Sequence, residues 1–148
     1  MLKEQLQNDL KTAMKAGDAR KKDALRFLSS TIKQVEIDTR EALPDEKILS
    51  IMQTELKKRR DSLEEFKNAG RMDDVAQQEY EIALITSYLP AQITAEELHA
   101  EVQKAVAEAG ATTPKDMGAV MKVLMPRVRD RAAGKAIQDA VQAALKGN

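Results

Sequence analysis

The sequence predicts an all-α protein, and three observations lead to that prediction. Helix-favouring residues (Ala, Leu, Glu, Lys, Gln and Met) fill most of the 148-residue chain. Aromatic residues make up only 3%, with two Tyr, two Phe and no Trp. Apolar residues recur at the three- and four-residue spacings of amphipathic helices. We expect an N-terminal antiparallel helical bundle with a long hairpin (residues 1–92), followed by a small three-helix tail subdomain (residues 93–148).

The first two helices are predicted from their ends and from their apolar stripes. Gly17 ends the first helix, and Asp18 can cap the second. A connector over residues 41–45 then leads through Pro44 into the third helix. The expected stripes are Leu2, Leu6, Leu10 and Ala13 in the first helix, and Ala24, Leu28, Thr31, Ile32 and Val35 in the second.

A long hairpin is expected from two helices, over residues 45–68 and 72–89, joined by a turn at residues 68–70. Arg59 falls in the middle of the apolar stripe of the first of these helices. An unpaired buried charge costs several kcal/mol, so Arg59 needs a partner. Because Glu79 lies about as far from the turn as Arg59 does, we predict an Arg59–Glu79 structural ion pair.

Two functional alternatives exist within this hairpin. Arg59 and its basic neighbours (residues 57–60) could contact phosphate, although the acids within residues 61–65 supply countercharges at helical spacing. Tyr80 and Tyr88 could stack on bases, but core packing with a bonded hydroxyl is the commoner role of such tyrosines.

The tail subdomain begins after a boundary at residues 90–93. Thr94 with Glu97 makes a capping box for its first helix, and Gly110 is a natural C-terminal cap. A last helix is expected over residues 134–146.

Between these helices lies the most informative stretch of the chain. Thr113 and Pro114 begin a helix in which the dipole favours Asp116, and we expect Pro126 to stop it and a basic connector to follow. The apolar face of this helix consists of Met117, Val120, Met121 and Leu124.

The cations of this stretch form the candidate RNA-binding site. The whole chain has no net charge, with 24 basic and 24 acidic residues. Between Lys115 and Lys135, however, Asp116 and Asp130 are the only acidic residues. Such a basic patch can meet phosphates of a folded RNA, and a solvated basic loop is the alternative interpretation. The predicted RNA-binding residues are Lys115, Lys122, Arg127, Arg129, Arg131 and Lys135.

No catalytic, metal or cofactor site is expected. With one His and no Cys, the usual nucleophile–base pairs and zinc ligand sets cannot be assembled within one chain, and His99 is interpreted as a surface residue. No glycine-rich phosphate loop is present. No apolar run approaches the roughly 20 residues of a membrane span, and the N-terminus is unlike a secretory signal. Absence of Cys fits a reducing compartment, so we expect a cytoplasmic protein.

Two blocks of the sequence resemble the YqeY-like family. One is KDMGAVMKVLMP, followed by a basic run and AAGK; the other is KKRRDSLEEFKNAGR, followed by YLPAQ. Together they imply similarity over nearly the whole chain. Two positions depart from the family pattern: Asp130 stands where glycine is common, and Ala133 stands where aspartate is common.

YqeY-like proteins are stand-alone relatives of the tail domain of GatB, a subunit of the tRNA-dependent aspartyl/glutamyl amidotransferase, a glutamine-dependent carbon–nitrogen ligase. The resemblance implies a tRNA-binding module associated with tRNA-dependent amidation, with amidotransferase subunits or other translation proteins as partners. No DNA or membrane partner and no amidase site are expected. The alternative is a helical protein-interaction module without an RNA role. The helix over residues 72–89 is apolar on two sides, and the module would dock through its second apolar face, formed by Tyr80, Leu84 and Tyr88, or through the methionine-rich face of the helix that begins at Thr113.

Overall fold

The computed structural model describes residues 1–146, which are helical and contain no strand. The all-α prediction is therefore confirmed for this part of the chain. The chain divides into two compact units, Met1–Tyr88 and Leu89–Asn148, whereas the predicted boundary lay after residue 92. The elements are α1 (Leu2–Ala16), α2 (Ala19–Thr39), α3 (Asp45–Asn68), α4 (Met72–Thr86), α5 (Ala95–Ala109), the 3₁₀ turn η1 (Pro114–Asp116), α6 (Met117–Val128) and α7 (Gly134–Lys146).

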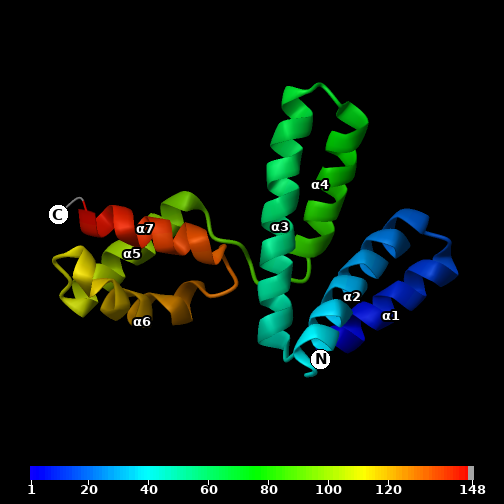
Figure 1. Ribbon diagram of the computed structural model, residues 1–148. Coiled ribbons are helices and arrows are strands. Elements are labelled where there is room, and N and C mark those ends of the chain that lie inside the picture. The colour runs from blue at the N-terminus through cyan, green and yellow to red at the C-terminus, as the bar shows by residue number, and fades with distance from the viewer. Residues whose placement is uncertain (147–148) are drawn as a thin grey trace. The chain divides into compact units, whose positions relative to one another are not determined.

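The first unit consists of two antiparallel hairpins, α1–α2 and α3–α4 (Figure 1). Gly17 ends α1 in a left-handed conformation (φ 71°), and the Asp18 carboxylate accepts from the Lys21 amide at 3.1 Å, as the sequence predicted. The Leu2 amide donates to the Asp45 carboxylate at 3.1 Å, which ties the start of α1 to α3. The largest fully buried side chains of this unit are Leu6, Leu25, Leu28, Ile48, Met52, Leu56 and Ile85.

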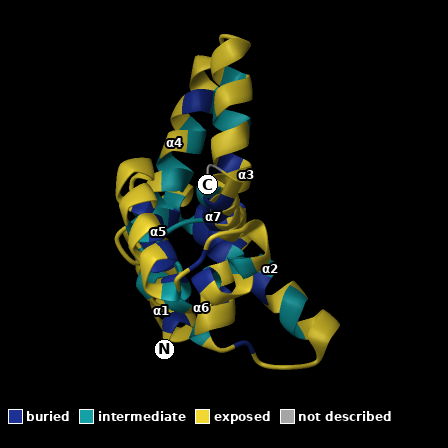
Figure 2. Ribbon diagram, turned by 90° about the vertical axis from the view of Figure 1, so that its left-hand side faces the viewer, coloured by how far each residue is buried: buried dark blue, intermediate teal, exposed yellow. Residues whose placement is uncertain are grey.

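The α3–α4 hairpin ends in an exposed turn, around residues 67–73 (Figure 2). Gly70 makes this turn with a positive φ of 70°, which glycine adopts without strain. Helix α4 stops at Thr86, short of the predicted Leu89. Because the ring of Pro90 disfavours helical geometry at the residue before it, the chain leaves the helix before the proline.

Arg59 lies inside the first unit with only 9% of its surface exposed. Its Nη1 atom is 2.7 Å from Oε2 of Glu55, and its Nε atom is 3.6 Å from Oε2 of Glu81. The predicted partner Glu79 is exposed, so the predicted Arg59–Glu79 pair is wrong, although the need for a partner is confirmed. Two positions along a helix are separated by a rotation of about 200°, so a helix that turns Glu81 inward turns Glu79 to solvent.

The second unit packs α5, α6 and α7 around its own apolar core. Thr94 Oγ1 accepts from the Glu97 amide at 3.1 Å at the start of α5, and Gly110 ends that helix with φ 64°. Gly110 caps the helix as the sequence predicted, and Thr94 supplies its half of the predicted capping box. The fully buried core side chains are Val102, Ala105, Val120, Leu124, Val128, Ile137, Val141 and Leu145.

Helix α6 continues past Pro126 to Val128, so the predicted stop at the proline is wrong. A proline in the last turn removes one backbone donor, and the Arg129 amide still closes the helix by donating to the Met125 carbonyl at 2.8 Å. Consequently Arg127 belongs to the helix, and the connector begins at Arg129. Asp130 then takes a left-handed conformation (φ 63°). Glycine adopts this conformation without a steric penalty, which gives a physical reason why glycine is common at position 130 in the family pattern.

Candidate nucleic-acid interface

Two of the six predicted RNA-binding cations are held by acids of α5. The Nη2 atom of Arg127 lies 2.7 and 2.9 Å from the two carboxylate oxygens of Glu108, and Nη1 lies 3.9 Å from Glu101. The hydrogen bond to Glu108 raises the pKa of Arg127 above its ordinary value. Lys104 also pairs with Glu101, at 3.6 Å. This side of the unit therefore alternates in charge and is not uniformly basic.

Arg131 has a structural role beside residues 91–93 of the second unit. Its Nε atom donates to the Ala91 carbonyl at 2.9 Å, and its Nη2 atom lies 3.8 Å from Glu97. The Ile93 amide donates to the Arg131 carbonyl at 2.8 Å, and the Gln92 side-chain amide donates to the Asp130 carbonyl at 2.9 Å. These bonds hold the segment from Ala91 to Ile93 against the connector, so Arg131 is less available to an external phosphate.

The remaining cations lie elsewhere on the second unit. Lys115, Lys122 and Arg129 are exposed and follow one another at intervals of seven residues. Lys122 lies on α6, Lys115 precedes that helix on η1, and Arg129 is the C-cap residue of α6. Lys135 is exposed in the first turn of α7. Within residues 1–146, no ion pair holds Lys115, Lys122 or Lys135.

The Asp116 carboxylate caps η1. Its Oδ2 atom accepts from the amides of Thr112 and Thr113, at 2.9 and 3.1 Å, and the Thr113 side chain completes the capping box. The two backbone hydrogen bonds lower the pKa of the Asp116 carboxyl. The predicted roles of Thr113, Pro114 and Asp116 at the start of the helix are thus confirmed.

The acids that face the arginines were missed by the sequence argument. Glu97, Glu101 and Glu108 are spaced four and seven residues apart, and Arg127 and Arg131 are spaced four apart. The glutamate spacings put all three on one side of α5, and this acidic stripe could have indicated countercharges for Arg127 on α6 and Arg131 on the connector. Over residues 89–148 the sequence holds eight basic and seven acidic residues. The basic excess of the stretch from Lys115 to Lys135 is therefore nearly cancelled within its own unit.

The surfaces of the alternative, protein-docking interpretation are also partly occupied. The Tyr88 hydroxyl donates to the Asp9 carboxylate, and the guanidinium of Arg20 lies 4.4 Å from the centre of the Tyr80 ring. Burial of Tyr88, together with its bond to Asp9, raises the pKa of its phenol. Met117, Met121 and Met125 pack against the core of the second unit and are only partly exposed.

Other kinds of site are absent from the part of the chain that the structure describes. Among residues 1–146, no group of three or more His, Asp or Glu side chains could hold a metal ion. None of the described helices combines the length and the apolar character needed to cross a membrane.

Comparison with known proteins identifies a family and several fungal relatives. A family model described as "Yqey-like protein" matches residues 3–145. The protein "Altered inheritance of mitochondria protein 41, mitochondrial" of Eremothecium gossypii is 41% identical over 98 residues, which cover 64% of this chain and 54% of the relative. The proteins of the same name from Vanderwaltozyma polyspora and Lachancea thermotolerans are 38% and 42% identical over 85 residues, covering 57% of this chain and 46% of each relative. The matches thus span about half the length of these relatives.

These relatives bear on the predicted location. All three are named as mitochondrial proteins. Our expectation of a cytoplasmic protein, which depended on the absence of Cys, is contradicted by that finding. Cysteine content reports the redox state of a compartment and does not distinguish one reducing compartment from another.

Proposed function

Because the chain belongs to the YqeY-like family, we propose that it is a non-catalytic module that binds tRNA through its second unit and is associated with tRNA-dependent amidation. The observation that carries the proposal is the exposure of Lys115 and Lys122 without a carboxylate partner in the described chain. An ammonium group without an internal partner can neutralise an external phosphate without first breaking an ion pair. The family's resemblance to the tail of GatB supports tRNA as the polyanion.

The arrangement of charge predicts a modest interaction. Lys115, Lys122 and Arg129 provide the expected phosphate contacts, and Lys135 on α7 is an exposed cation outside this group. Arg127 and Arg131 contribute less, because tRNA would have to compete with the acids of α5 for them. Three contacts predict that the logarithm of the binding constant falls with the logarithm of salt concentration with a slope of about −2 to −3.

The tRNA proposal is tested by fluorescence anisotropy with folded, labelled tRNA over a range of salt concentrations. The variant K115Q/K122Q removes the two unpaired charges, and it should weaken binding and make the salt slope about two units shallower. K11Q/K67Q removes two exposed charges from the first unit and serves as the matched control. Equal binding by wild type and K115Q/K122Q, with the control also equal, would remove these lysines from the mechanism.

Association with amidation needs a separate measurement. The whole chain is added to a purified tRNA-dependent amidotransferase, and the conversion of misacylated tRNA is measured. We expect a change that K115Q/K122Q diminishes and K11Q/K67Q retains. Unchanged conversion would remove the link to amidation and leave tRNA binding to be judged by the anisotropy experiment. Capture of a protein partner without any tRNA binding would instead favour the protein-interaction alternative.

A further inference from the structure

A groove in the first unit has the properties of a small-molecule site, and we propose that it binds an amphipathic carboxylate, that is, an apolar chain with an anionic end. The groove lies between α1, the C-terminal half of α2 and the connector that follows α2, and its volume is about 550 Å³. Volumes of this order are typical of ligand pockets. All of the residues involved lie in Met1–Tyr88, so the proposal is independent of tRNA binding by the second unit.

The floor of the groove is apolar. Leu6 from α1 and Ile32 from α2 are 1% and 2% exposed, and both contribute to its lining. Beside them lies Ile37, which is 59% exposed. Scattered exposed apolar residues are ordinary, but an exposed isoleucine within a hollow offers a ligand a surface from which water is readily displaced. An apolar chain lying along Ile37 would cover that surface.

The rim of the groove carries more unpaired positive groups than unpaired negative groups. Glu36 is already fully engaged, because Oε1 accepts from Lys3 Nζ at 2.6 Å and Oε2 accepts from the Leu43 amide at 3.1 Å. Lys33 and Arg40 also line the groove and belong to no ion pair within residues 1–146. Glu41 is the one lining carboxylate besides Glu36, so the unpaired groups at the rim are two cations and one anion. A ligand with a negative end matches this balance.

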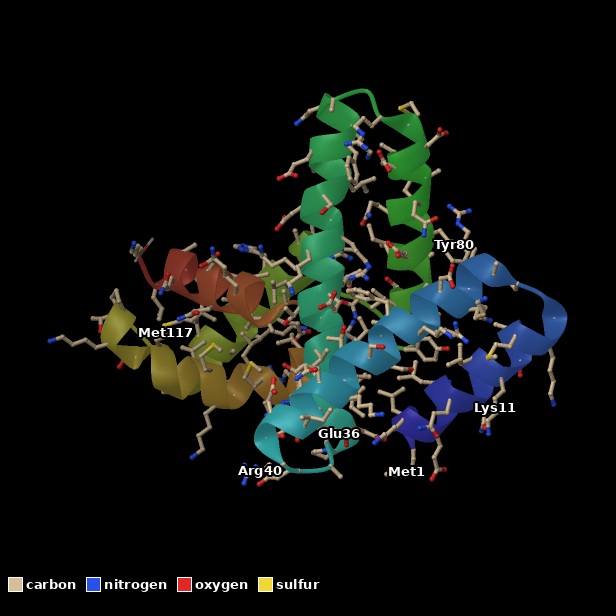
Figure 3. The ribbon with its side chains drawn as sticks, turned by 45° about the vertical axis from the view of Figure 1, so that its right-hand side comes forward. Met1, Lys11, Glu36, Arg40, Tyr80 and Met117 are labelled. Atoms are coloured by element: carbon tan, nitrogen blue, oxygen red, sulfur yellow. The ribbon has the colours of Figure 1, made fainter. Side chains whose placement is uncertain are left out.

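The two cations lie beside the exposed isoleucine along one side of α2. Lys33, Ile37 and Arg40 are separated by four and then three residues, which aligns them on one helical face. Figure 3 shows Glu36 and Arg40 near the end of α2, on the stretch close to Met1 at the start of α1. A ligand that covers Ile37 therefore has a cation at either end of its apolar contact. Its carboxylate can reach Lys33 or Arg40 while its chain stays on the floor.

The probe for this proposal is octanoate, with 1-octanol and octyltrimethylammonium as uncharged and cationic comparators. Isothermal titration with the whole chain gives affinities, and ¹H–¹⁵N NMR spectra locate the binding. We expect octanoate to bind more tightly than either comparator and to shift the amide signals of residues lining the α1–α2 groove. Undetectable binding of octanoate, or equal binding of the cationic comparator, would overturn the proposal.

Two variants, each with a matched control, test whether Ile37 and the rim cations bind octanoate. I37S should weaken octanoate binding roughly tenfold because the apolar contact is lost, whereas M72S, which alters a similarly exposed residue outside the groove, should not. K33Q/R40Q should weaken it about fivefold by removing the rim charges, whereas K11Q/K15Q on the outside of α1 should not. Equal losses in a variant and its control would show that octanoate adsorbs to exposed apolar or basic surface in general, and the groove would be excluded as a specific site.

Discussion

The guanidinium of Arg59 lies 2.7 Å from the carboxylate of Glu55, one helical turn earlier on the same helix, and both side chains are nearly excluded from solvent. Glu81 approaches from α4 at 3.6 Å, and the ring of Phe27 on α2 lies 5.0 Å from the guanidinium carbon. One buried cation thus contacts three helices of the first unit. The two carboxylates balance the charge of Arg59, but its Nε atom has no hydrogen-bond partner among residues 1–146, so its donors are not fully satisfied there.

Substitution of Glu55 should therefore destabilise the first unit. E55Q removes the closer countercharge from a buried cation, and we expect a loss of about 1–3 kcal/mol in the free energy of unfolding. E79Q, at the exposed position that the sequence suggested as the partner, should change it by less than about 0.5 kcal/mol. Urea denaturation monitored by circular dichroism measures both. Equal effects of the two substitutions would contradict the pairing described for Arg59.

The end of α2 should gain stability from glycine. Arg40 takes a left-handed conformation (φ 58°) as the C-cap of α2, a geometry that is unfavourable for a residue with a Cβ atom. R40G should be more stable than R40A by about 1 kcal/mol, because both lack the guanidinium but only alanine is strained there. Thermal and urea denaturation of the two variants makes the comparison. R40A being as stable as R40G would show that this conformation carries no penalty.

The Glu36 contacts predict a pH dependence of stability. The hydrogen bond from Lys3, followed by that from the Leu43 amide, lowers the pKa of Glu36 below its ordinary value of 4.5. A carboxyl whose pKa is lower in the folded state stabilises the fold above its unfolded pKa, and the contribution disappears as the pH falls through the folded pKa. Wild type should thus exceed E36Q in stability most clearly above pH 4.5, and the two should converge at more acidic pH.

The measurement is urea denaturation of wild type, E36Q and K3M at a series of pH values. K3M should raise the pKa of Glu36, so that its stability begins to fall at a higher pH than that of wild type. E64Q changes an exposed glutamate that forms no ion pair within the described part of the chain, and it corrects for the change in net charge. A difference between wild type and E36Q that does not vary with pH would contradict the role given to the Lys3–Glu36 contact.

Removal of an acidic residue from α5 should strengthen RNA binding, because the acids of α5 compete with RNA for the arginines. If tRNA binds the second unit, E108Q should tighten binding, by about twofold to threefold, because Arg127 is released from its closest acid and a repulsive charge is removed. The same substitution at Glu64, in the first unit, should have little effect. Anisotropy titration at low salt measures both. Weaker binding by E108Q would show that Glu108 orients Arg127 for RNA and does not compete with it.

Helix positions followed from the sequence because they depend on local signals. Gly17, Asp18, Thr94, Gly110 and Thr113 occupy the caps that their residue types predicted, and the apolar stripes form the two cores. A cap or a stripe is determined by neighbours within a few residues, which a single sequence displays directly.

Pairings between helices did not follow from the sequence, because they depend on register. Counting from the turn placed Glu79 opposite Arg59, but a shift of two residues changes which side of α4 faces inward, and Glu81 takes that position. A wrongly predicted helix end had a similar effect on the candidate RNA site. Pro126 predicts that α6 ends there and that Arg127 lies in the connector, but the helix continues to Val128 and presents Arg127 to the acids of α5.

The turn at Gly70 also has a practical consequence. Every residue from Lys67 to Asp73 is exposed, and an added Cβ atom at Gly70 would meet nothing within 4 Å. An epitope tag or a small reporter domain spliced in after Gly70 would therefore leave both cores intact. Such a fusion would let the chain be captured from cell extracts while both the α1–α2 groove and the lysines of the second unit stay unmodified.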